Sequence, residues 1–196
     1  MRYKRERAIA FVGSLMLISA TFFALLGYVL ASLLLWLGGM LTLALFVQRV
    51  VYYFERQDIA ERMKEGTVLL AFSLLPAYVA GYFEHIRSEA ELITWLHNTL
   101  YIIETASVPR LAALIMFHIL SVISIIMISS ALLDFSRLAG ERSYVAAAVF
   151  LFLAAVLLSP LFAFLGVGAA FLNASVYGRI RVPLLILALL SSLLAG

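Results

Sequence analysis

The chain has 196 residues, of which 65% are hydrophobic and only 13% are charged, with a mean hydropathy of +1.09 and a net charge of +3. An ordinary globular domain is about 45–50% apolar and about 25% charged, so the composition excludes a water-soluble fold and predicts a chain dissolved in the lipid bilayer. The absence of cysteine excludes disulfides, thiol chemistry and Cys-ligated metal sites. We expect the basic balance to set membrane orientation and not to bind nucleic acid.

The first apolar stretch, residues 8–47, carries no charge. As one helix it would run about 60 Å, whereas the hydrocarbon core of a bilayer is about 30 Å thick. We therefore predict two spans, 8–27 and 31–53, joined by a turn near Gly27–Ser32. The basic start resembles a signal peptide, but the apolar run that follows is too long, so a retained span is expected.

The second span ends in Tyr52 and Tyr53, which are predicted interfacial anchors because Tyr favours the boundary between lipid and water. The segment "ERQDIAERMKEG" follows, with Asp58 four residues before Arg62, a spacing that suits a helical ion pair. We interpret it as a solvated helical extension that stops at Gly66, with a docking helix for a partner as the alternative.

The rest of the chain predicts four more spans. Pro76 and Pro160 interrupt two of them, and the last is short for a full crossing. The expected fold is an all-α polytopic transmembrane helix bundle, a single integral membrane domain over 1–196 with about six spans, or five if the last run does not cross. These four spans are 67–83, 110–133, 144–171 and 182–195.

An amphipathic helix near 89–107 is predicted between the third and fourth spans. "SEAE" has the spacing of a capping box with Ser88 as the cap, and Pro109 is expected to set the end of the helix. Leu92, Leu96, Leu100 and Ile103 fall on one stripe. Trp95 and Tyr101 suit a helix that lies in the membrane interface and are further candidate anchors.

The distribution of Lys and Arg predicts the orientation of the chain. With six spans, ten of the 14 basic residues fall on the side that holds the N-terminus, the 48–66 loop and the 134–143 loop. The positive-inside rule then places both termini in the cytoplasm of a multi-pass cell-membrane protein.

His118 is the one ionisable side chain that lies clearly inside a predicted span and not at its end. Such residues are functional candidates by default, so His118 is a candidate ligand or proton contact. Its simpler role is a hydrogen bond to a neighbouring hydroxyl, with Ser14, Ser73, Ser121 and Ser124 as candidates. A haem between His85 and His118 is conceivable, but no two histidines have the three- or four-residue spacing of a metal pair on a helix.

Several functional classes lack their motifs in this sequence. The cores of the predicted spans hold no Asp, Glu, Lys or Arg, whereas ion-coupled carriers usually need a carboxylate there. There is no phosphate-binding glycine loop, zinc-protease helix or nucleophile elbow. The sequence therefore predicts no enzyme, no catalytic residues, no cofactor and no metal site. Clusters of small residues at 38–39, 128–131 and 166–170 predict close helix contacts, within the chain or between copies.

Two stretches, "QRVVYYFERQDIAERMKEG" and "ALLDFSRLAGERSYVAAAVFLFLAAVLL", resemble an archaeal family of small polytopic membrane proteins, the domain of unknown function 996. The resemblance covers about two-thirds of the chain and implies a helical membrane fold but no activity. This chain departs from the family by Pro160 in place of a Gly-Ala pair and by its last apolar run.

Three functions remain open from the sequence. The first is a non-catalytic accessory or scaffold component of a membrane assembly, with the lipid bilayer, membrane proteins or a second copy of the chain as its partners. The second is a small carrier or channel for an uncharged or lipid-like solute, working through hydroxyls and His118 near the two prolines. The third and weakest is a haem- or quinone-binding membrane subunit.

Overall fold

The computed structural model describes residues 4–26, 28–81, 95–156 and 165–175, and within these ranges every regular element is a helix. The expected all-α class is therefore confirmed for the described residues. The helices are α1 (Lys4–Leu25), α2 (Val29–Tyr52), α3 (Gln57–Val79), α5 (Trp95–Thr105), α6 (Val108–Ala139), α7 (Ser143–Val156) and α8 (Val167–Ser175).

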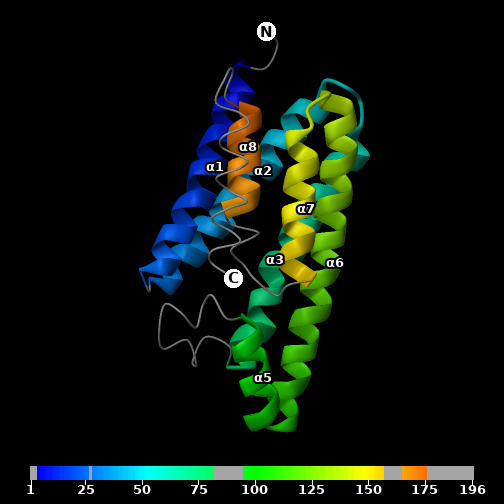
Figure 1. Cartoon of the computed structure of the whole chain (residues 1–196). Coiled ribbons are helices and arrows are strands. Elements are labelled where there is room, and N and C mark those ends of the chain that lie inside the picture. Colours follow the sequence, from blue (N-terminus) through cyan, green and yellow to red (C-terminus); the bar gives the residue numbers. More distant parts are fainter. Residues whose placement is uncertain (1–3, 27, 82–94, 157–164, 176–196) are drawn as a thin grey trace.

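Six helices form a closed ring of antiparallel neighbours (Figure 1). Following the ring, α1 packs on α2, α2 on α3, α3 on α6, α6 on α7, α7 on α8, and α8 returns to α1. The short helix α5 packs beside α6 at one end of the bundle. Tyr53 lies 3.3 Å from Glu6, and Arg62 lies 2.7 Å from Asp134, so the start of α1, the α2–α3 turn and the end of α6 share the opposite end, called here the charged end.

Three helices in the described part are long and apolar enough to cross a membrane. They are Glu6–Ala24, Leu30–Tyr52 and Val108–Ala139. They match the first, second and fourth predicted spans, and the first turn lies between Leu25 and Val29. The last predicted span, 182–195, lies outside the described residues.

Four aromatic side chains from four helices pack together inside the ring near its charged end: Phe46 of α2, Phe135 of α6, Tyr144 of α7 and Phe171 of α8. Each is at most 5% exposed. Ring centroids are 4.7 Å apart for Phe135 and Tyr144, and 5.1 Å apart for Tyr144 and Phe171. Phe46 lies edge-on to Phe135 and Phe171 at 5.7 and 6.2 Å, a favoured aromatic geometry. This aromatic cluster holds α2, α6, α7 and α8 together.

Small residues let neighbouring backbones approach closely, as the sequence predicted. A methyl group at Gly39 would lie 2.8 Å from Leu17 and 3.1 Å from the Gly13 carbonyl oxygen, so α1 and α2 meet almost backbone to backbone. A methyl group at Gly168 would lie 3.1 Å from the Ser14 carbonyl oxygen. These contacts fall within one chain, which places the glycines at 38–39 and 166–170 in intramolecular packing.

Gly66 was predicted to stop a helix, and this prediction is wrong. Helix α3 runs without a break from Gln57 to Val79, so it begins ten residues before the predicted third span of 67–83. Gly66 is buried against α6, where Ser124 Oγ donates a hydrogen bond of 2.6 Å to its carbonyl oxygen. The close approach of α6, and not a turn, accounts for glycine at this position, since a methyl group would lie 2.7 Å from Ile128.

The predicted loop over 134–143 is also shorter than expected. Helix α6 continues beyond the apolar segment to Ala139, and Asp134 and Arg137 form an ion pair within this last part. The helix ends at Gly140, which has a left-handed φ of 66°. The helix is about 48 Å long, more than the hydrocarbon core requires.

The fifth predicted span, 144–171, was expected to be one crossing, but the structure has two helices in this range. They are α7 and α8, and Asn173 Nδ2 near the end of α8 donates to Ser143 Oγ at the start of α7, at 2.7 Å. Phe150 also faces Gly166. The two helices are therefore antiparallel, so residues 144–171 do not form one kinked crossing. Seven of the nine residues of α8 are buried.

Helix α5 covers only part of the predicted interfacial helix near 89–107, since residues 82–94, including Ser88, lie outside the described part. It ends at Thr105, before Pro109, which instead occupies the first turn of α6. This is where proline is best tolerated, because the first turn needs no amide donor. Leu100 and Ile103 are 51% and 49% exposed, whereas Ile102 packs inward.

We predict that Phe171→Ala destabilises the bundle by roughly 2 kcal/mol, the cost of the cavity it leaves. In a water-soluble protein, the free energy of transferring the side chain from water to the core would add to this loss. That contribution is small here because lipid is as apolar as the core. Unfolding in mixed micelles of increasing sodium dodecyl sulfate would measure the change. Phe152→Ala is the matched control, since Phe152 is 57% exposed on the outer face of α7. Equal losses for the two variants would contradict the aromatic cluster as the centre of the fold.

Candidate functional site

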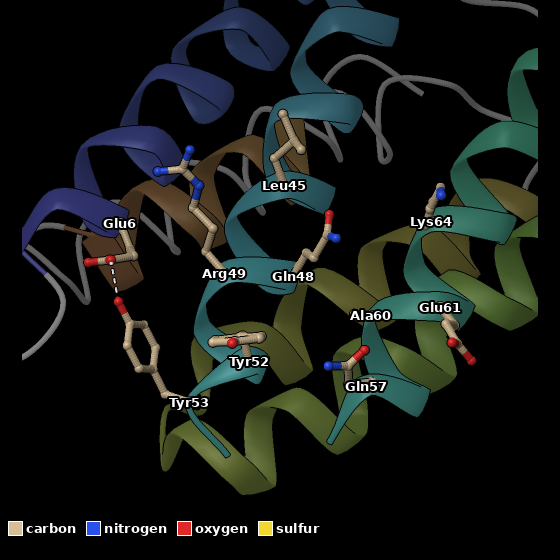
Figure 2. Close-up of a pocket in the computed structure, with 10 residues that line it drawn as sticks. All are labelled: Glu6, Leu45, Gln48, Arg49, Tyr52, Tyr53, Gln57, Ala60, Glu61 and Lys64. Carbon is tan, nitrogen blue, oxygen red and sulfur yellow. Dashed lines mark hydrogen bonds between the residues drawn. The ribbon is translucent and has the colours of Figure 1, made fainter. Parts of the chain in front are cut away.

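A polar groove with a volume of about 660 Å³ opens at the charged end, between α1, α2 and α3 (Figure 2). Most of its lining side chains are polar or aromatic, although the helices around them are apolar. The groove is lined by Glu6, Leu45, Gln48, Arg49, Tyr52, Tyr53, Gln57, Ala60, Glu61 and Lys64.

Helix α2 supplies the floor of the groove. Leu45, Gln48 and Tyr52 recur at spacings of three and four residues, so they share one outward face, and Arg49 lies next to it. Leu45 and Tyr52 are 54% and 71% exposed. The face therefore changes from apolar to polar within the last two turns of α2.

Helix α3 supplies one wall through Gln57, Glu61 and Lys64, again at spacings of four and three. The α2–α3 turn that sets this wall is tight, and Glu55 in it has a left-handed φ of 55°. Figure 2 shows Gln57 directed toward α2 and Glu61 at the outer side of α3.

The opposite wall comes from α1 and is fixed by a hydrogen bond. The Tyr53 hydroxyl donates to Glu6 Oε1 at 3.3 Å, and Glu6 is only 8% exposed (Figure 2). This contact ties the start of α1 to the end of α2. The four ionisable acids and bases of the groove, Glu6, Glu61, Arg49 and Lys64, sum to zero formal charge.

A network of ion pairs lies beside the groove and joins α3 to α6. Arg62 bridges Asp134 at 2.7 Å and Asp58 at 3.4 Å, and Arg137 reaches the other oxygen of Asp134 at 3.3 Å. The predicted Asp58–Arg62 pair is thus confirmed. The hydrogen bond from Arg56, together with its positive charge, lowers the pKa of Asp58 from 3.8 to about 2.

His118 does not bond a hydroxyl, contrary to the prediction. Its Nδ1 lies 2.9 Å from the Leu114 carbonyl oxygen, which can only accept, so Nδ1 carries the proton. The other nitrogen, Nε2, is buried and has no hydrogen-bond partner among the described residues. Ser121 and Ser73 instead bond each other across α3 and α6, at 3.2 Å.

The remaining predicted site residues are dispersed. Tyr52 and Tyr53 line the polar groove, whereas Tyr101 is 44% exposed on α5, in the opposite half of the bundle. Trp95 begins α5, but its side chain and His85 lie outside the described part. Their roles as interfacial anchors stay predictions. In the ranges that the structure describes, no three His, Asp or Glu side chains come close enough to share a metal ion.

Sequence reasoning missed the groove because it treated the segment that ends at Gly66 as a solvated helical extension with no partner on α2. The signal was present as two polar stripes at helical spacing, Gln48 to Tyr52 and Gln57 to Lys64. Their meeting could not be predicted, because it depends on the angle at which α3 returns along α2. Glu6 gave no signal, since its burial depends on Tyr53.

Comparison of the chain with protein-family models, with curated proteins and with solved structures finds no match. The resemblance to the domain of unknown function 996 therefore stays a prediction, and function has to be argued from the molecule itself.

We predict that Asp58 titrates at a pH of about 2 in the folded protein and that Arg56→Gln moves its titration toward 3.8. Because the folded pKa lies below the unfolded one, the contact stabilises the fold above pH 3.8 and this contribution disappears as the pH falls through about 2. Carbon-13 NMR of the Asp58 carboxyl group measures the midpoint. Arg142→Gln, at another exposed position of the same end, should leave it unchanged.

Proposed function

We propose that the protein is a non-catalytic accessory or scaffold component of a membrane assembly in the cell membrane. The observation that carries this proposal is the filled interior of the helix ring. Phe46, Phe135, Tyr144 and Phe171 close it near the charged end, and buried aliphatic side chains such as Leu17, Leu43 and Leu151 continue the core away from that end. Because α8 packs against α1 and α7 with most of its residues buried, the bundle resembles a packed core more than a conduit.

Close backbone contacts support a static role. Gly39 of α2 and Gly168 of α8 both lie against α1, and Gly66 of α3 lies against α6, so no side chain fits between these helices. A protein that alternates between two conformations must slide or rock its helices, and such contacts resist it because any displacement opens voids. The outward faces, in contrast, carry large apolar side chains that suit lipid or the helices of a partner.

We propose that the charged end faces the cytoplasm and that the chain crosses the membrane about six times. The basic residues of the 48–66 and 134–143 segments support this orientation, since both segments lie at the charged end. The predicted cytoplasmic C-terminus concerns residues outside the described part and stays a prediction.

Crosslinking in native membranes, followed by mass spectrometry of the purified adducts, tests the accessory role. We expect one membrane protein, or a second copy of this chain, to be captured in stoichiometric amount through a lipid-facing helix. A photoreactive residue at Phe152 or Phe72, both more than half exposed, would report such contacts. The same residue at the buried Phe135 is the control. Capture of lipid alone from every outward position would contradict the proposal.

One observation favours a second candidate, a carrier or channel for an uncharged or lipid-like solute. The unpartnered Nε2 of His118 is an acceptor aimed into a buried environment, where an unmade hydrogen bond costs stability. A hydroxylated solute could supply the missing donor. Ser73 and Ser121 lie on the same pair of packed helices.

Flux through proteoliposomes separates the two functions. On the accessory role, wild-type protein and His118→Ala should both equal protein-free liposomes for glycerol and for a fluorescent phospholipid analogue. If wild-type protein gives flux that His118→Ala loses while Ser121→Ala retains it, the carrier function replaces the accessory one. Circular dichroism of each variant confirms that helix content is unchanged.

A further inference from the structure

We infer that the polar groove binds the headgroup of a phospholipid that carries a primary amine, with the acyl chains against an apolar furrow between α2 and α3. This inference depends on membrane embedding and is independent of the accessory role.

The walls of the groove continue into lipid-facing stripes. On α2, Gln48 is followed toward the membrane by Leu45 and Leu41, which are 54% and 44% exposed. On α3, Lys64 is followed by Val68 and Phe72, which are 40% and 65% exposed. Since these residues recur at three- and four-residue spacing, each stripe stays on the face that lines the groove. The polar groove is therefore followed, toward the membrane, by two exposed apolar stripes on neighbouring helices, which we propose hold the acyl chains.

The order of charges along the groove fits a zwitterionic headgroup. Of the charged side chains that line α2 and α3, Arg49 and Lys64 are the closest to the apolar stripes, whereas Glu61 lies about one turn further out on α3. In a phospholipid the phosphate adjoins the acyl-bearing backbone, and the headgroup amine lies beyond it. In the proposed complex the phosphate lies between the two inner cations, with Arg49 on the α1 side and Lys64 on the α3 side (Figure 2), and the amine lies at the depth of the outer carboxylate.

The donors that this headgroup needs are uncommitted. Among the described residues, no hydrogen bond or ion pair engages the side chains of Gln48, Arg49, Gln57, Glu61 or Lys64. Gln48, beside Leu45 on the inner part of the groove, offers a neutral donor to phosphate oxygens. Gln57 lies one turn beyond Glu61 and is directed toward α2 (Figure 2). A net-anionic headgroup without an amine would leave Glu61 facing like charge, and a quaternary amine could not donate to it.

Native mass spectrometry of the purified full chain in a non-ionic detergent tests the inference, by titration with phosphatidylethanolamine, phosphatidylcholine and phosphatidylglycerol. We expect a one-to-one adduct with phosphatidylethanolamine that forms about fivefold more tightly than either of the others, the factor expected for one charge contact at a membrane surface. Lys64→Gln and, separately, Arg49→Gln should each weaken it about fivefold. Soluble phosphoethanolamine should not compete, because it has no chains for the furrow.

Glu61→Gln separates headgroup recognition from general attraction to phosphate. It should abolish the preference for phosphatidylethanolamine over phosphatidylglycerol while leaving the adduct with phosphatidylglycerol intact. Arg142→Gln, an exposed cation outside the groove, is the matched control and should change neither. Equal binding of all three lipids, or adducts that Lys64→Gln and Arg49→Gln leave unaltered, would overturn the inference. Because all these side chains are exposed, the variants are expected to fold, and their helix content is checked by circular dichroism.

Discussion

The contact of four aromatic rings from four different helices is the interaction on which the rest of the structure depends. Phe46, Phe135, Tyr144 and Phe171 come from four different helices, and each is buried in contact with at least two of the others. In a bilayer, apolar side chains gain little by leaving lipid, so association depends on packing contacts that lipid chains cannot match. Rigid rings from several helices provide many such contacts at little loss of side-chain freedom.

Glycines allow equally close packing between the backbones of neighbouring helices. Gly39, Gly66 and Gly168 each lie where a neighbouring helix comes too close for a side chain. Hydroxyls add hydrogen bonds at the same contacts, as Ser124 does to the Gly66 carbonyl oxygen. Ser32 donates in the same way to the Ala20 carbonyl oxygen across the first hairpin, at 2.8 Å. Small and hydroxylated residues therefore fix the ring, which leaves the larger aliphatic side chains to face lipid.

The charged end combines two arrangements with different consequences. Arg62, Asp134 and Asp58 are paired with each other, so they join α3 to α6 and have little capacity left for a ligand. Arg49 and Lys64 lie on the side of the ring formed by α2 and α3, with carboxylates present but not bonded to them. The contrast between satisfied and unsatisfied charge at one end of the molecule distinguishes a structural network from a surface available for binding.

The sequence by itself determined the class of the protein, its long apolar helices and the gathering of charge at the helix ends, because these follow from composition and the thickness of a bilayer. It also determined local pairs such as Asp58–Arg62, which depend only on helical spacing. Only the tertiary structure decided that Gly66 lies inside a helix, that α7 and α8 are antiparallel and that His118 bonds a carbonyl oxygen. It also brought Glu6, Arg49 and Lys64 to one groove. The physical reason is that lipid-soluble helices look alike to a local pattern, whereas their order, angle and contacts depend on shapes that come together only when the helices pack.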